Sequence, residues 1–509
     1  MARYIRIAVI LVAGVAIATF APPRLALAAS GQSGPPAATN VTTDAKTVVT
    51  FTWGGSLADQ MPSLSIFRKY GMHATYFVAS GLVCLLNQSE CQKSSPYLTI
   101  HDLREIAADG DEIGGLSVLH ERLTALPAAE AKREICDDRA NLYRWGLRPT
   151  DFAYPFAAVN RATEALTRQC GYNAGLSAGA VRGANRCDMC AWAETIPPKN
   201  PMDVRAPVEV NSVHTTWSAS TYESIVQGAQ QHGGGWVVFT IHDICPAQCA
   251  LGTTSPVLRS VLSWLQGQAS HNVAVETMHQ VIGGPLQPPV RGPAPRAMPA
   301  FGVVNANLVK AKGGQPACFE DADYGGTVAS FAYHPTGGRH GSAAETVRIT
   351  KAGSGNAKLL PSTDLGLCAP LVAAGHAYAT GVWYKSNIPT RIEIYRRTLL
   401  GGWDYWITSP VFQASDSWRQ ASWTTPAAPP GTTGLSFGLT TNSVGTITTT
   451  DYSLTIAKSH RVQILLAGLL VVVVGAGLVT HGHYRYARYA KAEADDAEAD
   501  DAESIPAEP

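Results

Sequence analysis

The sequence of 509 residues contains little charge and no excess of either sign. Only 15% of the residues are charged, and 39 basic residues balance 39 acidic ones. A formal net charge of zero gives no basis for nucleic-acid binding, which depends on clustered positive charge. The apolar share of 46% is typical of a globular protein with large cores, and the length predicts two or three domains.

The first residues have the pattern of an export signal. Arg3 and Arg6 precede an apolar run at residues 7–20, and the small residues Ala-Leu-Ala follow at 26–28. This layout predicts a cleaved secretory signal peptide over residues 1–28. An uncleaved membrane anchor is the alternative, but the apolar run is short for a helix that spans a bilayer.

A second apolar run, residues 462–480, contains 19 residues and no charge. At about 1.5 Å per residue it is long enough to cross a bilayer, so we expect one transmembrane helix. The signal peptide orients the chain with its bulk outside and residues 481–509 in the cytoplasm. That tail is acidic, with eight acids and no base after residue 492. The sequence therefore predicts a single-pass protein of the cell membrane.

Ten cysteines in an exported chain indicate disulfides. Pairing between sequence neighbours is favoured, although ten cysteines allow many connectivities. A zinc site formed by four of the thiolates (Cys187, Cys190, Cys245 and Cys249) is the alternative, which an extracellular location disfavours. The neighbouring pairs are Cys84 and Cys91, Cys136 and Cys170, Cys187 and Cys190, Cys245 and Cys249, and Cys318 and Cys368.

Between the termini the composition divides the chain. A flexible leader is expected at residues 29–44, followed by folded segments at 45–283 and 301–457. The linker between them, residues 284–300, is rich in proline, which predicts a stiff and extended spacer. The second folded segment has short alternating strands and no helical periodicity, which is typical of an antiparallel β-sandwich.

The first folded segment alternates strand-like and helix-like stretches. Residues 48–53 are apolar and β-branched, whereas residues 128–145 have the spacing of an amphipathic helix. Such alternation predicts an α/β fold with a parallel sheet or barrel, in which functional residues lie at the carboxyl ends of the strands. Those ends are Gly54 with Gly55, His120, Tyr154 with Pro155, and His242 with Asp243.

Five sequence segments in this region resemble one family. VTFTWGGSLADQ, KYGMHATYFVAS, ADGDEIGGLSVLHERLTAL, DFAYPFA and GGGWVVFTIHDIC follow the order of landmarks in NodB-like polysaccharide deacetylases of carbohydrate esterase family 4. The resemblance implies a distorted (β/α) barrel. It also implies hydrolysis of N-acetyl groups on a sugar polymer, with an Asp–His–His metal site that usually holds zinc, an Asp as base and a His as acid.

The residues that carry this chemistry are mostly replaced. In the family's register Gly54 occupies the position of the base, and Gly55 and Leu116 occupy two metal-ligand positions. His120 is the single ligand retained, and His242 remains as the candidate acid. One ligand cannot hold zinc at useful affinity, so we expect no cofactor.

A rearranged site is the alternative. Asp59, Glu121 and Asp243 lie near strand ends and could supply substitute ligands for zinc or a similar divalent metal, although each is equally plausible as a solvated surface charge.

The second folded segment resembles the carbohydrate-binding-like sandwiches that accompany extracellular sugar-active domains. Aromatic rings can stack on the apolar faces of sugars, although alternation along a strand should bury about half of them. The candidate rings are Trp383, Tyr384, Trp403, Tyr405 and Trp406.

These observations favour a membrane-anchored extracellular protein that binds cell-wall or other extracellular polysaccharide through a catalytically impaired deacetylase-type barrel. One alternative is an active metal-dependent N-deacetylase with a rearranged site. Another is a structural envelope protein whose domains serve only protein contacts.

Overall fold

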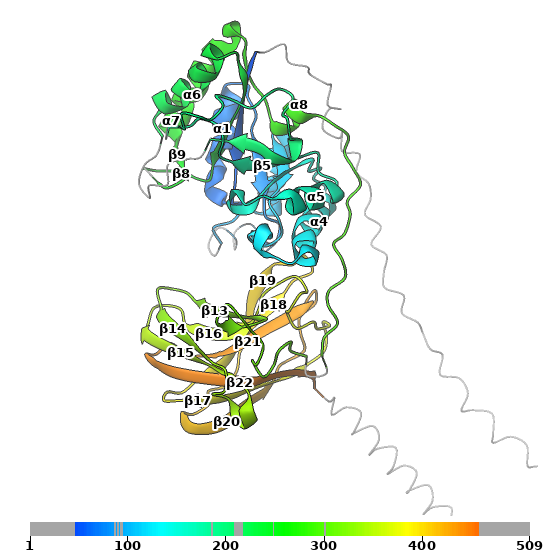
Figure 1. Cartoon of the computed structure of the whole chain (residues 1–509), viewed down its shortest axis with the longest axis vertical. Coiled ribbons are helices and arrows are strands. Elements are labelled where there is room, and N and C mark those ends of the chain that lie inside the picture. Colours follow the sequence, from blue (N-terminus) through cyan, green and yellow to red (C-terminus); the bar gives the residue numbers. More distant parts are fainter. Residues whose placement is uncertain are drawn as a thin grey trace, which may run out of the picture.

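The computed structural model describes residues 46–457, apart from residues 86–87, 89–90, 92–94, 185–186, 208–216, 248 and 300–301. The predicted signal peptide, leader, transmembrane helix and acidic tail all lie outside the described residues. Within the described part, no helix is both long and apolar enough to cross a membrane. Figure 1 shows an α/β domain, called the first domain below, and a β-rich second domain, connected by a long extended segment.

The first domain is built on a curved parallel sheet of eight strands, which confirms the expected α/β class. The strand order is β10-β1-β2-β3-β4-β5-β6, and β7 pairs with β1 along its whole length. The strands are β1 (Thr47–Trp53), β2 (Thr75–Val78), β3 (Glu112–Gly115), β4 (Asp151–Ala153), β5 (Ala174–Ala178), β6 (Val204–Ala206), β7 (Gly235–Ile241) and β10 (Val273–Val275).

Helices follow most of these strands and cover the outer face of the sheet (Figure 1). A small ribbon, β8 (Ile244–Cys245) with β9 (Thr253–Thr254), follows β7. The helices are α1 (Pro62–Lys69), α3 (Ile100–Ala108), α4 (Ala128–Arg144), α5 (Arg161–Gln169), α6 (Ala219–Gln231), α7 (Ser255–Gln268) and α8 (Met278–Ile282).

Alternation along β1 explains which residues reach the interior of the curved sheet. Phe51 and Trp53 pack outward in a core cluster shared with the helices, whereas Val48 packs inward against residues of the neighbouring strands. Successive side chains of a strand point to opposite faces. Gly54 therefore continues the inward series beyond the end of β1, and Trp53 faces the helices.

The second domain consists of two antiparallel sheets that share one core, as the sandwich pattern predicted. Inward residues of both sheets, such as Val382 and Phe437, are fully buried in that core. The larger sheet is β14 (Val328–His334), β15 (Ala344–Lys351), β22 (Gly445–Ile456), β17 (Tyr378–Ser386) and β20 (Ser415–Thr424). The smaller sheet is β19 (Trp403–Thr408), β18 (Arg391–Arg397) and β21 (Gly434–Thr440).

Two ribbons complete the second domain. They are β13 (Phe319–Asp323) with β16 (Ala357–Pro361), and β11 (Ala311–Lys312) with β12 (Gln315–Pro316). All ten cysteines form disulfides between sequence neighbours, as favoured above. The four-thiolate zinc site is therefore wrong, because none of its thiols is free.

The proline-rich segment lies along the first domain, to which hydrogen bonds connect it. Arg139 of α4 donates from Nη2 to the carbonyl of Gln287 at 2.6 Å and from Nη1 to that of Pro288 at 3.0 Å. Farther along, the amide of Gly292 donates to the carboxylate of Asp137 at 3.0 Å. Hydrogen bonds from α4 thus hold this segment in place.

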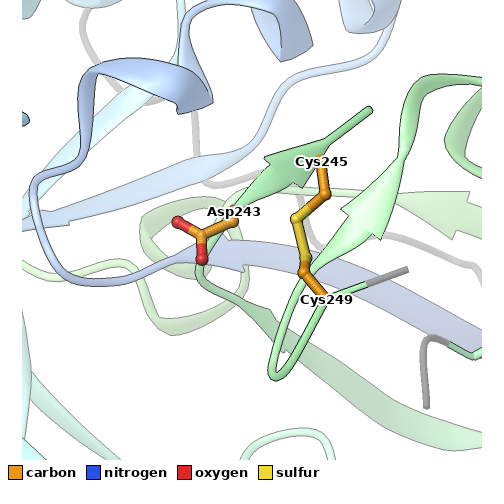
Figure 2. Close-up of side chains that lie close together, drawn as sticks. All are labelled: Asp243, Cys245 and Cys249. Atoms are coloured by element: carbon orange, nitrogen blue, oxygen red, sulfur yellow. A yellow bond between two sulfur atoms is a disulfide. The ribbon is translucent and has the colours of Figure 1, made fainter. Parts of the chain in front are cut away.

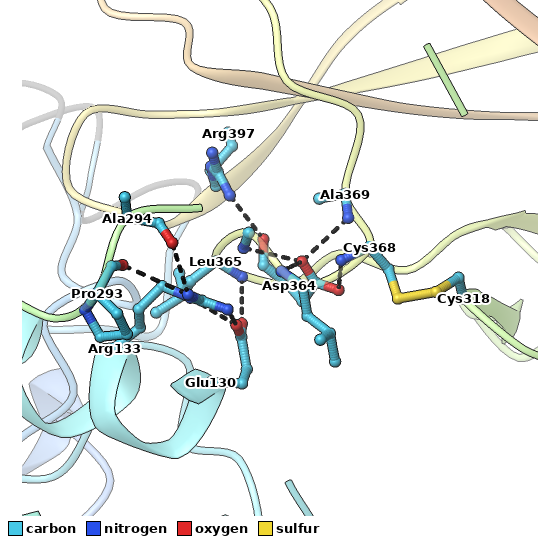
Figure 3. Close-up of polar contacts among 12 residues, drawn as sticks. Glu130, Arg133, Pro293, Ala294, Cys318, Asp364, Leu365, Cys368, Ala369 and Arg397 are labelled. Carbon is cyan, nitrogen blue, oxygen red and sulfur yellow. Dashed lines mark hydrogen bonds and ion pairs between the residues drawn. A yellow bond between two sulfur atoms is a disulfide. The ribbon is translucent and has the colours of Figure 1, made fainter. Parts of the chain in front are cut away.

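Helix α4 also contacts the second domain (Figure 3). The buried Glu130 accepts a hydrogen bond from the amide of Leu365 at 2.6 Å and forms an ion pair with Arg133 at 2.5 Å. One turn before the end of α4, the side-chain amide of Asn141 donates to the backbone carbonyl of Leu400 at 2.7 Å. Leu400 lies at the tip of the hairpin between β18 and β19.

The segment that meets Glu130 is itself rigidly organised. The carboxylate of Asp364 accepts the backbone amides of residues 366–369 at 2.8–3.0 Å, and Arg397 donates to the Asp364 carbonyl (Figure 3). The disulfide of Cys368 with Cys318 joins the same turn to β13. These buried polar contacts fix how the second domain lies against the first.

Candidate functional site

The carboxyl ends of β1 and β7 bring Gly54 and His242 together. A side chain at position 54 would begin 3.5 Å from Cδ2 and Nε2 of His242. The side-chain amide of Gln60 donates to the carbonyls of both residues, and the His242 amide donates to the carbonyl of Leu251 at 2.9 Å. The position that the family resemblance assigns to the base therefore does face the candidate acid.

His120 approaches the same place from the loop that follows β3. Burial and the charge of His242 both lower the pKa of His120, so the two imidazoles lie within electrostatic reach of each other. Burial also lowers the pKa of His242, although the nearby charge of Asp243 opposes this effect. Both rings are therefore neutral at pH 7 and can act as hydrogen-bond donors or acceptors.

Phe156 forms an exposed edge of this place. Its ring centroid is 4.9 Å from that of His120, and the guanidinium of Arg122 lies 4.9 Å above it. With 58% of its surface exposed, Phe156 offers a ring face to a ligand. We call Gly54, His120, Phe156 and His242 the strand-end site.

The backbone around the strand-end site is strained. A non-glycine residue at positive φ costs on the order of 1–3 kcal/mol, and such residues cluster at functional sites. Five of them follow the strand ends here, with φ between 52° and 67°: Ser56, Ser117, His120, Phe156 and Ala157.

Buried acids of α4 support these loops, and sequence reasoning did not identify them. Glu134 accepts the amide of Leu119 at 2.8 Å. Asp138 accepts the amides of Ser80 at 2.9 Å and Leu116 at 3.1 Å. The helical pattern of residues 128–145 contained no signal for these roles, because the partners are backbone groups of distant loops.

A pair of carboxyl groups lies beside His242. Burial, followed by the charge and a hydrogen bond of Asp243, raises the pKa of Asp59 to about 6. Because two adjacent carboxylates resist ionising together, Asp59 holds a proton to higher pH than an ordinary aspartate does. Asp59 and Asp243 are two of the three acids considered for a rearranged site, and the structure brings these two together.

Two of the three metal-ligand positions that the family resemblance implies, Gly55 and Leu116, have no donor side chain. Gly55 has a φ of +90°, and a side chain there would point toward Leu57. Leu116 is only 4% exposed and packs in the apolar interior of the sheet. Neither position supplies a ligand beside His120, and a catalytic zinc ion needs three protein ligands.

The described residues contain two other groups of potential ligands. Asp243 lies near Cys245 and Cys249, but Figure 2 shows these cysteines joined as a disulfide, which leaves the carboxylate as the one hard donor. The second group, His101, Asp102 and Glu105, lies on α3, where Asp102 already caps the helix through Thr99. Neither group includes His120 or His242.

The aromatic candidates of the second domain have different environments. Tyr384 is 1% exposed and its hydroxyl donates to the carbonyl of Gln413, so it is a core residue and cannot stack on a sugar. Trp406 packs against the core. The guanidinium of Arg339 covers the ring of Trp383 at 3.3 Å, and Trp403 is only partly exposed. Tyr405, 56% exposed, is the most accessible of the five.

Comparison with known proteins bears on the first domain. Residues 41–175 match the family model described as polysaccharide deacetylase. No curated protein matches the chain.

Several solved structures are similar to the chain at low identity. A family 4 carbohydrate esterase from Streptomyces lividans in complex with acetate is 18% identical, covering 46% of this chain and 95% of that one, with a TM-score of 0.30. A peptidoglycan deacetylase from Bacillus subtilis is 18% identical; the match covers 46% of this chain and 90% of that one, with a TM-score of 0.26. A Streptococcus pyogenes deacetylase in complex with acetate is 21% identical; the match covers 32% of this chain and 66% of that one, with a TM-score of 0.26. This chain thus spans just under two thirds of the streptococcal protein.

Proposed function

We propose that the first domain, in which residues 41–175 match the polysaccharide deacetylase model, binds an acetylated polysaccharide and does not hydrolyse it. The observation that carries the proposal is the pairing of Gly54 with His242. A general base contributes about 10²–10⁴-fold to such a reaction, and here its position has no functional group. The metal that would polarise the acetyl carbonyl has no ligand set either.

Binding is favoured because the architecture around the lost chemistry persists. The left-handed residues at the strand ends are costly to maintain, and buried acids of α4 hold their loops in place. Two neutral imidazoles can bond to hydroxyl or acetamido groups, and Phe156 presents a ring for a sugar face. A site that served only packing would not need these strained and exposed features.

We extend the proposal to location. The predicted signal peptide and the predicted helix at 462–480 would hold both domains outside the cell on a single membrane anchor. Cell-wall or other extracellular polysaccharide would then be within reach.

The test uses purified full-length protein with the N-acetylglucosamine hexamer as probe. We expect saturable binding by calorimetry and no acetate release, with or without added zinc. Phe156→Ala should weaken binding, whereas Val444→Ala, an exposed apolar residue between β21 and β22, is the control. Acetate release that a chelator abolishes would contradict the proposal, as would hexamer binding equal in wild type and Phe156→Ala.

The raised pKa of Asp59, which lies beside Asp243, supports a second candidate function, metal-independent hydrolysis. A carboxyl with a pKa of about 6 can donate or accept a proton near neutral pH, and the pair adjoins His242. In that case acetate release would occur without metal, peak near pH 6 and disappear in Asp243→Asn. A chelator-resistant acetate signal with this pH profile would favour the second candidate over pure binding.

A further inference from the structure

Three tyrosines of the second domain gather on one side of the smaller sheet. Tyr395 on β18 is paired with Tyr405 on β19, and their ring centroids are 6.1 Å apart with planes at 78°. Tyr324, directly after β13, brings its hydroxyl within 3.5 Å of the Tyr395 hydroxyl. Tyr324 and Tyr405 are 46% and 56% exposed. We call Tyr324, Tyr395 and Tyr405 the tyrosine cluster.

A buried polar network lies beneath the tyrosine cluster. Lys358 forms an ion pair with Glu393 at 3.1 Å and donates to the Tyr395 hydroxyl at 3.0 Å. Its ammonium also lies 4.7 Å from the ring centroid of Tyr324 and 5.0 Å from that of Tyr395. One lysine therefore orients two of the three rings.

Asn356 completes the network. Its amide donates to Glu393 at 2.7 Å and to the Tyr324 hydroxyl at 3.1 Å. Asn356 is 3% exposed and Lys358 is 1% exposed, yet the Asn356 Oδ1 atom has no hydrogen-bond partner.

Such a network is a costly way to stabilise a fold. Replacing a buried ion pair by apolar residues is often neutral or stabilising, and an unpaired buried polar atom costs about 1–3 kcal/mol. Stability therefore does not account for a buried lysine and asparagine under exposed rings. Positioning of the phenol hydroxyls and rings for a ligand does account for it.

We propose that the tyrosine cluster is a second polysaccharide-binding site. Ring faces would stack on the apolar faces of sugar residues, and the oriented phenols would bond to sugar hydroxyls. If the Tyr324 side chain moves aside, the unpaired Oδ1 of Asn356 would accept a hydrogen bond from a sugar hydroxyl. Sequence reasoning identified only Tyr405 of this site, because the network comes from strands scattered between residues 324 and 405.

One strand of the second domain, β13, connects the tyrosine cluster with the vicinity of the strand-end site. Glu320 of β13 pairs with Leu360, and four residues farther along, just after the strand, the Tyr324 amide donates to the Asn356 carbonyl, so the two side chains lie on the same face. That separation is about 13 Å along the strand. The carboxyl of Glu320 lies within electrostatic reach of Glu121, the neighbour of His120.

The hairpin that bears Tyr395 and Tyr405 is also docked on the first domain. At its tip Gly402 approaches the carbonyl of Gly81 so closely that a Cβ would lie 2.3 Å from that oxygen. Gly401 similarly abuts Val118 in the loop that leads to His120. With the domains fixed in this way, one polysaccharide chain can occupy both sites, and the second contact is then intramolecular.

The experiment measures retention of full-length protein on insoluble chitin, xylan and peptidoglycan. We expect Tyr324→Ala with Tyr405→Ala to weaken retention on the bound polymer about 10-fold, the order expected for lost aromatic anchors. Trp418→Ala, on β20 of the larger sheet, is the matched control and should bind as wild type. Thermal unfolding of each variant verifies that the fold is intact.

The ligand class rests on the function proposed for the first domain, but the two proposals fail separately. Loss of retention in the tyrosine variant with no effect of Phe156→Ala would support the tyrosine cluster and overturn the strand-end proposal. Loss of retention in Phe156→Ala with no effect of the tyrosine variant would overturn the proposal for the tyrosine cluster. Retention of wild type on none of the three polymers would overturn both.

Discussion

Position 54 is a glycine at which a side chain would start 3.5 Å from the imidazole of His242. No positive φ is required there, so an aspartate could be accommodated. Position 55 differs, because its φ of +90° disfavours any side chain. The two glycines of the Trp-Gly-Gly-Ser segment therefore have different physical roles: the first leaves space beside a histidine, and the second permits a turn.

Gly54→Asp should raise the pKa of His242 by about one unit or more, because a nearby carboxylate favours the protonated imidazole. NMR titration of the histidine ring protons measures this shift. Gly55→Asp is the contrasting variant and should mainly lower the melting temperature. An unchanged His242 titration in Gly54→Asp would show that position 54 does not face this ring.

At the scale of elements, α4 connects the parts of the molecule. Glu134 and Asp138 hold the loops after β2 and β3, Glu130 and Asn141 meet the second domain, and Arg139 holds the extended segment. The sequence predicted an amphipathic helix here and did not identify roles for its charged residues. Most of these charged residues are buried, because they bond to groups up to 235 residues away along the chain.

Burial should make the stability of the first domain depend on pH through this helix. Burial raises the pKa of Glu134 to about 8, above its ordinary value of 4.5. The folded state then holds a proton that the unfolded state has released, so stability falls as pH rises from about 5 to 8. Glu134→Gln should flatten this part of the curve of melting temperature against pH, and Glu105→Gln on α3 is the control. A curve that remains equally steep in Glu134→Gln would contradict the assignment.

The sequence predicted the helices and strands better than the tertiary contacts between them. The strand β1, the helix α4 and the sheets of the second domain follow from periodicity that short segments carry on their own. The placement of Gly54 and His242 at carboxyl ends of strands also followed, whereas the pairing of β1 with β7 that brings them together did not. Phe156 and the tyrosine cluster did not follow, since their exposure depends on how distant segments pack.

For the whole molecule, the fixed arrangement of the two domains is the main consequence of these contacts. Glu130 is buried with Arg133 on one side and the Leu365 amide on the other. Removing one member of such a buried group costs about 3–5 kcal/mol, far more than a surface pair.

Glu130→Ala should therefore loosen the second domain while leaving both cores folded. We expect faster hydrogen exchange at the Leu365 amide and a larger radius of gyration by small-angle X-ray scattering. Asp404→Ala serves as control, because its pair with Arg396 at 3.7 Å is largely exposed. Identical scattering from Glu130→Ala and wild type would show that other contacts hold the domains.

The hydrogen bonds that Arg139 makes to Gln287 and Pro288 also determine where an isolated fragment of the first domain can end. Arg139 is fully buried, so water cannot reach its guanidinium to take the place of those two carbonyl acceptors. A fragment that stops at the end of the last helix would carry this buried charge with half of its acceptors missing. The proline-rich segment thus belongs to the folding unit that precedes it, and a stable fragment should extend to residue 294, where Arg133 makes the last of these bonds.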